Sequence, residues 1–175
     1  PNYPPAELFI NGKSYGKQSK NNSSLKNRYR LMWMDAVYEP GEVKVVAYNK
    51  EGKAVAEKVV RTAGKPHHIE LVSNRNELTA DGKDLAYVTV KVVDKDGNLC
   101  PTDNRQINFS AKGTGKYRAA ANGDPTNLEQ FHLPKMHAFN GMLTAIIQAG
   151  ETAGEIVFTA KANGVKAGNI RIQTK

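Results

Sequence analysis

The sequence predicts an all-β fold made of two tandem β-sandwich domains. Turn-forming dipeptides that end in glycine recur along the chain, among them Asn11-Gly12, Asp96-Gly97 and Asn140-Gly141. Asn and Gly adopt positive φ at low cost, as two-residue hairpin turns require. The runs between the turns have strand length, and none keeps apolar residues at helical spacing beyond two turns. Many short strands separated by turns are typical of a sandwich rather than of βαβ units.

The predicted strands are short runs that alternate or are wholly apolar. In Glu42–Tyr48, for example, the order is Glu-Val-Lys-Val-Val-Ala-Tyr. The polar stretch Lys17–Asn27 lacks such a pattern and is expected to be a mobile loop. The clearest runs, in chain order, are Glu7–Ile10, Glu42–Tyr48, Ala54–Val60, His68–Val72, Leu85–Val93, Gln106–Ser110, Met142–Ala149, Glu155–Ala160 and Asn169–Gln173.

Small and strand-breaking residues mark a boundary between the two domains. Arg61–Pro66 has the order Arg-Thr-Ala-Gly-Lys-Pro, and a new alternating run begins at His68. We therefore expect domains at residues 1–64 and 65–175. An immunoglobulin-like sandwich takes about 100 residues and seven strands, which residues 65–175 can supply. Residues 1–64 hold fewer strands than that, so the first domain is expected to be truncated at its N-terminus.

Length and composition exclude several classes of protein. The chain has 175 residues, 25 basic and 17 acidic side chains, a net charge of +8 and one cysteine. It is too short for a (β/α)₈ barrel, which needs roughly 250 residues, and it has no apolar run near the roughly 18 residues of a membrane span. A single cysteine excludes an internal disulfide. No basic and then apolar leader follows Pro1, so a signal peptide is expected to be absent or already removed.

Two short motifs near the start lack the structural context that their chemistry needs. Gly12–Gly16 matches G-x-S-x-G, but a nucleophile elbow requires a helix after the turn, and Lys17–Ser24 has no apolar residue with which a helix could pack. A phosphate-binding loop would need a glycine where Glu7 stands. We therefore expect a hairpin turn at Asn11-Gly12.

The acidic stretch Asp94–Asn98 resembles the start of a calcium loop. An EF-hand needs glycine at its sixth position and a bidentate glutamate at its twelfth. Here glycine is fourth and the twelfth residue is Arg105, so we expect a hairpin turn. Cys100 has no neighbour in the sequence that would activate a thiolate, and we expect neither a bound metal nor a cofactor.

The four histidines fall into two pairs. His67 and His68 are adjacent, so on a strand they are expected to point to opposite faces. His132 and His137 lie in an irregular segment, where a zinc site with Asp124 is an alternative to solvated or hydrogen-bonding histidines.

The first domain holds the main basic stretch and the single tryptophan. Lys13–Arg30 contains six basic residues and no acid. Such a patch could meet nucleic acid or an anionic polysaccharide, but only Tyr15 and Tyr29 could stack on bases, so we expect a solvated loop and no nucleic-acid partner. Trp33 is either a core residue or an exposed platform for sugar stacking.

The segment from Asn122 to Gly141 differs from the rest of the chain. It has two prolines and no sustained alternation. A long irregular stretch inside a compact domain is usually a packed and sometimes functional loop. The simpler expectation is an Ω-like loop that covers one end of the sandwich with its apolar side chains, Leu128, Phe131, Leu133, Met136 and Phe139.

Two sets of motifs resemble a known enzyme family, glycoside hydrolase family 2. The first set resembles the small sandwich domain that follows the catalytic barrel in bacterial β-galactosidases: Glu7–Gly16, Trp33, Tyr38–Tyr48 and Val60–Gly64. The second set is similar to the C-terminal domain of the same enzymes, itself similar to invasin-type immunoglobulin-like modules: Leu78–Val90, Asp96–Asn98, Asn122–Pro125 and Ala138–Gly141. The motifs keep their order over nearly the whole chain.

The resemblance implies a non-catalytic C-terminal region of a β-galactosidase-like enzyme. Its partners would be the catalytic barrel and the other domains of the parent chain. The family's two catalytic glutamates belong to a barrel, with carboxyl groups about 5 to 5.5 Å apart, that no part of this chain resembles. No residue here inherits either role, and hydrolysis by this chain alone is not expected.

Contact with an oligosaccharide is expected, if anywhere, in the irregular segment. Asn122 and Asp124 would bond sugar hydroxyls, and Phe131 or His132 would offer an apolar face. The resemblance also implies a periplasmic, cell-surface or secreted bacterial location. The alternatives are a cell-surface immunoglobulin-like adhesion or spacer module and a stand-alone carbohydrate-binding module.

Overall fold

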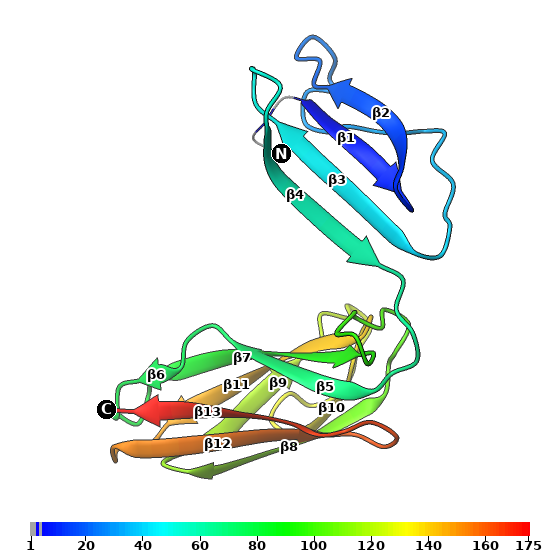
Figure 1. Cartoon of the computed structure of the whole chain (residues 1–175). Helices are drawn as coiled ribbons and strands as arrows, with labels where there is room; N and C mark the ends of the chain where they lie inside the picture. The colour runs from blue at the N-terminus through cyan, green and yellow to red at the C-terminus, as the bar shows by residue number, and fades with distance from the viewer. Residues whose placement is uncertain (1–2, 4) are drawn as a thin grey trace. The chain divides into compact units, whose positions relative to one another are not determined.

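The computed structural model describes Tyr3 and residues 5–175, and within them the regular secondary structure consists of strands (Figure 1). The predicted all-β class is confirmed. The chain divides into two compact units, unit 1 up to Thr62 and unit 2 from Ala63 to Lys175. None of the described residues belongs to a helix long and apolar enough to cross a membrane.

Unit 1 is a four-stranded antiparallel sheet with the strand order β2-β1-β3-β4. The turn between β1 and β2 is formed by Asn11 and Gly12, which have φ values of 48° and 80°. Positive φ at both positions suits a hairpin turn, so the hairpin predicted here is confirmed and G-x-S-x-G leads into a strand rather than a helix. The strands are β1 (Pro5–Ile10), β2 (Lys13–Ser19), β3 (Glu42–Tyr48) and β4 (Ala54–Arg61).

Alternation along β1 gives unit 1 its buried face. Ala6, Leu8 and Ile10 are buried, while the residues between them are half-buried. The half-buried Trp33 lies on the long connection from β2 to β3, and its indole N–H donates to the carbonyl of Gly16 at 2.8 Å. The predicted loop Lys17–Asn27 was wrong for its first three residues, because β2 continues to Ser19 by pairing with β1.

Unit 2 is a two-layered sandwich. One sheet has the order β5-β7-β11-β9, and the other has the order β10-β8-β12-β13-β6. Its pairs are antiparallel except for β13 with β6, which is parallel. The strands are β5 (His68–Ser73), β6 (Glu77–Leu78), β7 (Leu85–Val93), β8 (Gln106–Gly113), β9 (Gly115–Ala121), β10 (Lys135–His137), β11 (Met142–Ala149), β12 (Gly154–Lys161) and β13 (Gly168–Thr174).

The core of unit 2 lies between the two sheets. On β7 every second residue from Ala86 to Val92 is fully buried, as the period of two along a strand requires. Phe158 on β12 and Ile147 on β11 meet these residues in one apolar cluster, which draws on both sheets. The hydrophobic effect of this burial is the main favourable term in the folding of unit 2.

The start of unit 2 is held by a buried carboxylate and a histidine pair. Asp94 accepts a hydrogen bond from the backbone N–H of Gly64 at 2.7 Å. The two rings of His67 and His68 touch, with Nδ1 atoms 3.0 Å apart. The prediction that these rings point to opposite faces was wrong, because β5 begins at His68 and strand alternation does not extend to His67.

Candidate functional site

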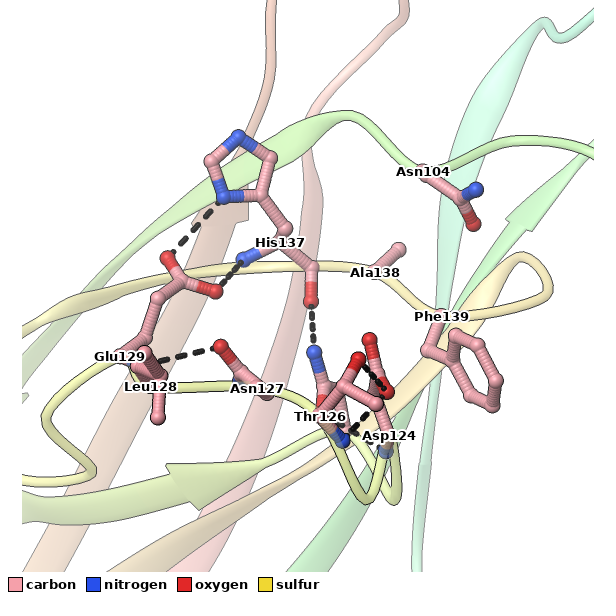
Figure 2. A pocket seen from close by; sticks show the side chains of 10 residues that line it. Asn104, Asp124, Thr126, Asn127, Leu128, Glu129, His137, Ala138 and Phe139 are labelled. Atoms are coloured by element: carbon pink, nitrogen blue, oxygen red, sulfur yellow. Dashed lines mark hydrogen bonds and ion pairs between the residues drawn. The ribbon is translucent and has the colours of Figure 1, made fainter.

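The irregular segment and β10 form the wall of a pocket of about 520 Å³ on unit 2 (Figure 2). β10 lies within the segment that was predicted to be irregular, and it pairs with β8 through Met136 and Ile107. This pairing brings Asn104, which precedes β8, to the same pocket. The lining residues are Asn104, Asn122, Asp124, Thr126, Asn127, Leu128, Glu129, His137, Ala138 and Phe139.

Asn122 closes the loop at its base. Its side-chain amide donates to the carbonyl of His137 at 3.0 Å, and its Oδ1 accepts the backbone N–H of Asp124, also at 3.0 Å. Both ends of the amide are therefore used to hold the loop. Asn is suited to this task because its short side chain can bond the backbone two residues ahead.

Asp124 begins a turn of the loop, in which the backbone N–H of Asn127 donates to its carbonyl at 3.2 Å. One carboxylate oxygen, Oδ1, accepts the backbone N–H of Thr126 at 2.8 Å and its hydroxyl at 2.7 Å. The bond from the Thr126 backbone, followed by the hydroxyl bond, lowers the pKa of Asp124. The group is therefore ionised at neutral pH. Its other oxygen, Oδ2, has no bonding partner among the described residues.

Glu129 and His137 form a second bonded pair in the pocket wall. The carboxylate accepts the backbone N–H of His137 at 3.1 Å and contacts the ring Nδ1 at 3.0 Å. Burial raises the pKa of Glu129, but the two bonds from His137, together with smaller contributions from the His137 charge and Asn127, outweigh this effect and lower the pKa. Figure 2 shows this pair on one side of the pocket and the Asp124–Thr126 turn on the other.

The groups left open to a ligand are few and of mixed character. In the described part of the chain, Asp124 Oδ2 and the Nδ2 of Asn104 make no hydrogen bond, while Oδ1 of Asn104 accepts the backbone N–H of Asn140. Leu128 is 97 % exposed and Phe139 is partly buried. A carboxylate oxygen, an amide donor and apolar walls can bind a neutral, hydroxyl-rich molecule.

The four residues predicted for sugar contact separate into two pairs. Asn122 and Asp124 lie together in the pocket wall. Phe131 and His132 are exposed and lie outside the lining set, because the backbone carbonyl of Phe131 is bonded to Ala120 and so places this part of the loop along β9. The pocket wall also includes residues that no sequence motif marked for ligand contact: Asn104, Asn127, Glu129 and Phe139.

The zinc alternative has no support in the geometry. His137 bonds Glu129, and His132 lies outside the pocket wall. Across Tyr3 and residues 5–175, no group of three or more His, Cys, Asp and Glu side chains could hold a metal ion.

Comparison with known families gives two matches. The profile described as glycoside hydrolase family 2 C-terminal domain 5 matches residues 69–171, which hold the pocket. A domain of unknown function (DUF4982) matches residues 1–56.

Individual relatives agree with the family matches. A β-galactosidase, BoGH2A, of Bacteroides ovatus is 41 % identical over 97 % of this chain and 19 % of its own length. A β-glucuronidase of Formosa agariphila is 24 % identical over 96 % of this chain and 17 % of its own length. The chain therefore spans about a fifth of the length of the curated relatives it matches.

Solved structures show the same arrangement of strands. A glycosyl hydrolase family 2 member from Bacteroides cellulosilyticus has a TM-score of 0.85 and 32 % identity, covering 99 % of this chain and 22 % of that one. A β-glycosidase from Bacteroides vulgatus has a TM-score of 0.88 and 26 % identity, covering 98 % of this chain and 21 % of that one.

Proposed function

We propose that this chain, which belongs to glycoside hydrolase family 2 through its C-terminal domain 5, supports the catalytic part of a β-galactosidase-type enzyme. The observation that carries the proposal is the 41 % identity to a β-galactosidase over 97 % of the chain. The carboxylates of the pocket, Asp124 and Glu129, are already bonded to Thr126 and His137. Their role here is to shape a loop, and bond cleavage belongs to another part of the enzyme.

The pocket on unit 2 is proposed to contact the carbohydrate substrate. Asp124 Oδ2 would accept a sugar hydroxyl, and Asn104 Nδ2 would donate to one. Phe131, which is 57 % exposed and lies outside the pocket wall in the same loop, would supply the apolar face that aromatic rings offer to sugars. Asn122 contributes by holding the loop, since both ends of its amide are bonded to the chain.

Titration of galacto-oligosaccharides into the 175-residue chain, followed by calorimetry, tests the carbohydrate contact. We expect saturable binding that Asp124→Ala abolishes and Phe131→Ala weakens, because the first change removes the open acceptor and the second an apolar surface. Asp96→Ala is the matched control: this exposed acid lies in the turn after β7 and is absent from the pocket wall. Absence of binding by the unmodified chain, or equal binding by all variants, would refute the contact.

The sequence that adjoins this chain in its gene tests the accessory role. A barrel with a pair of catalytic glutamates would support it, whereas further sandwich modules would favour an adhesion or spacer protein. A periplasmic or cell-surface location stays a prediction, which fractionation of the source cells can check.

A further inference from the structure

Large apolar side chains are gathered on the connection between β2 and β3. Of the thirteen large apolar side chains that are exposed in the described residues, five lie within residues 25–38. Leu25 and Met34 are each 83 % exposed. Surface apolar residues are normally scattered singly, and a concentration of them marks an interaction site. We call this set the apolar patch: Leu25, Tyr29, Met34, Val37 and Tyr38.

Hydrogen bonds hold the backbone that carries the apolar patch. The Trp33 indole bonds Gly16 of β2 at 2.8 Å, and the Tyr38 hydroxyl meets the hydroxyl of Thr62 at 3.2 Å. The Arg28 guanidinium donates to the carbonyl of Asn22 at 3.0 Å. Val60 on the edge strand β4, two residues before Thr62 in the sequence, is also exposed, at 61 %.

The composition of the patch fits a protein partner with an acidic rim. Tyr, Met and Arg are enriched at the cores of protein interfaces. Lys26, Arg28 and Arg30 alternate with the apolar side chains and favour acidic groups opposite them.

We infer that the apolar patch docks onto the catalytic part of the longer protein to which this chain is joined. The inference rests on the proposed function. The matched relatives are between five and six times as long as the region they share with this chain, so most of such a protein is available as a partner within the same chain. Covalent linkage gives such a partner a high effective concentration, and a patch of a few side chains is then sufficient for docking.

Hydroxyl-radical footprinting of the full-length protein and of the 175-residue chain tests the docking. Met34, Tyr29 and Tyr38 are reactive and exposed, so their oxidation reports burial directly. We expect their oxidation to be several-fold slower in the full-length protein than in the isolated chain, while Leu128 in the pocket wall reacts equally in both.

Equal oxidation of the patch in the two proteins would overturn the inference. Slow oxidation of the patch in the isolated chain would also overturn it. Protection that is independent of protein concentration would mean that the chain covers its own patch. Protection that increases with protein concentration would mean that a second copy covers it.

Substitutions distinguish docking from a general loss of folding. In the full-length protein, Met34→Lys with Val37→Lys should raise Tyr29 oxidation to the rate of the isolated chain. Val72→Lys, at an exposed position on β5, is the control and should leave it slow. The docking test and the test of the proposed function can fail independently, because a domain of any kind could protect the patch. The sequence of the adjoining domain therefore tests the proposed function by itself.

Discussion

The buried carboxylate of Asp94 ties the start of unit 2, at Gly64, to the turn that follows β7. It accepts hydrogen bonds from the backbone of Gly64, Asp96 and Asn98 at 2.7–2.9 Å, and from the Asn98 amide at 3.1 Å. The backbone bond from Gly64, followed by the side-chain bond from Asn98, holds the pKa of Asp94 well below its usual range. In the turn that resembles a calcium loop, the first acidic residue, Asp94, thus accepts hydrogen bonds from groups of the chain.

The stability of unit 2 is therefore expected to depend on pH through Asp94. A carboxyl group whose pKa is depressed by folding stabilises the folded state above its unfolded pKa of about 3.9, and this contribution is lost as pH falls below that value. We expect Asp94→Asn to lower the free energy of unfolding at pH 7. In this variant the free energy of unfolding should also decrease less steeply as pH falls from about 5 to about 2.

Urea unfolding of wild type and Asp94→Asn at pH 7 and pH 3 measures this difference. Asp96→Asn serves as the control, because the Asp96 side chain is exposed and makes no hydrogen bond within the described residues. An unchanged pH slope in Asp94→Asn would contradict the role given to this carboxylate.

Single residues of the site were predictable where they lie close together in the sequence. Asn122 and Asp124 stand two positions apart in a long irregular segment, and both reach the pocket wall. Asn104 could not be found in this way, because it joins them only through the pairing of β10 with β8. That pairing depends on strand register across the loop, which local composition does not specify.

At the scale of the elements, interior strands were predictable and several edge strands were not. The bounds of β3, β7 and β11 agree with the predicted runs, and each of these strands has neighbours on both sides. The strands β6, β9 and β10 were missed, and β2 was predicted only as the second arm of the hairpin at Asn11-Gly12; all four lie at sheet edges. An edge strand pairs on one side only and often carries polar residues, so its alternation is weak.

One tyrosine side chain helps to fasten the irregular loop to the edge strand β9, where the backbone N–H of Ala120 also donates to the carbonyl of Phe131. The Tyr117 hydroxyl donates to the carbonyls of Leu133 and Phe131, at 2.8 and 3.1 Å. Burial raises the pKa of Tyr117 to about 12, so the hydroxyl keeps its proton and remains a donor over the physiological range. The Tyr117 hydroxyl thus adds to the backbone bonds that hold the loop at the sandwich, and the sequence alone did not suggest this contact.

Removing the Tyr117 hydroxyl should loosen the loop while leaving the sandwich folded. We expect Tyr117→Phe to cost about 1 kcal/mol, the usual net value of a hydrogen bond, and to speed proteolytic cleavage between residues 125 and 134. Tyr87→Phe is the matched control, since the Tyr87 hydroxyl has no bonding partner in the described structure. Limited proteolysis followed by mass spectrometry measures the rates, and equal cleavage in the two variants would contradict the proposed fastening.

At the scale of the whole molecule, the two units have separate cores of unequal size. Buried apolar residues in unit 1 are Ala6, Leu8, Ile10 and Ala47. The large apolar cluster is drawn from residues 63–172 and fills the space between two sheets. Stability increases with the surface that folding removes from water, so unit 2 should be the more stable unit.

Urea is therefore expected to unfold the chain in two steps, with unit 1 first. The single Trp33 lies in unit 1, so its fluorescence should report the first step, whereas far-ultraviolet circular dichroism reports both. Leu8→Ala should lower the free energy of unfolding of unit 1, measured by fluorescence, by about 2–5 kcal/mol and leave the later transition unchanged. Phe158→Ala should lower the free energy of unfolding of unit 2 by about 3–5 kcal/mol and leave the first transition unchanged, because each substitution leaves a cavity in one core. If either variant moved both transitions together, the two units would form one cooperative structure.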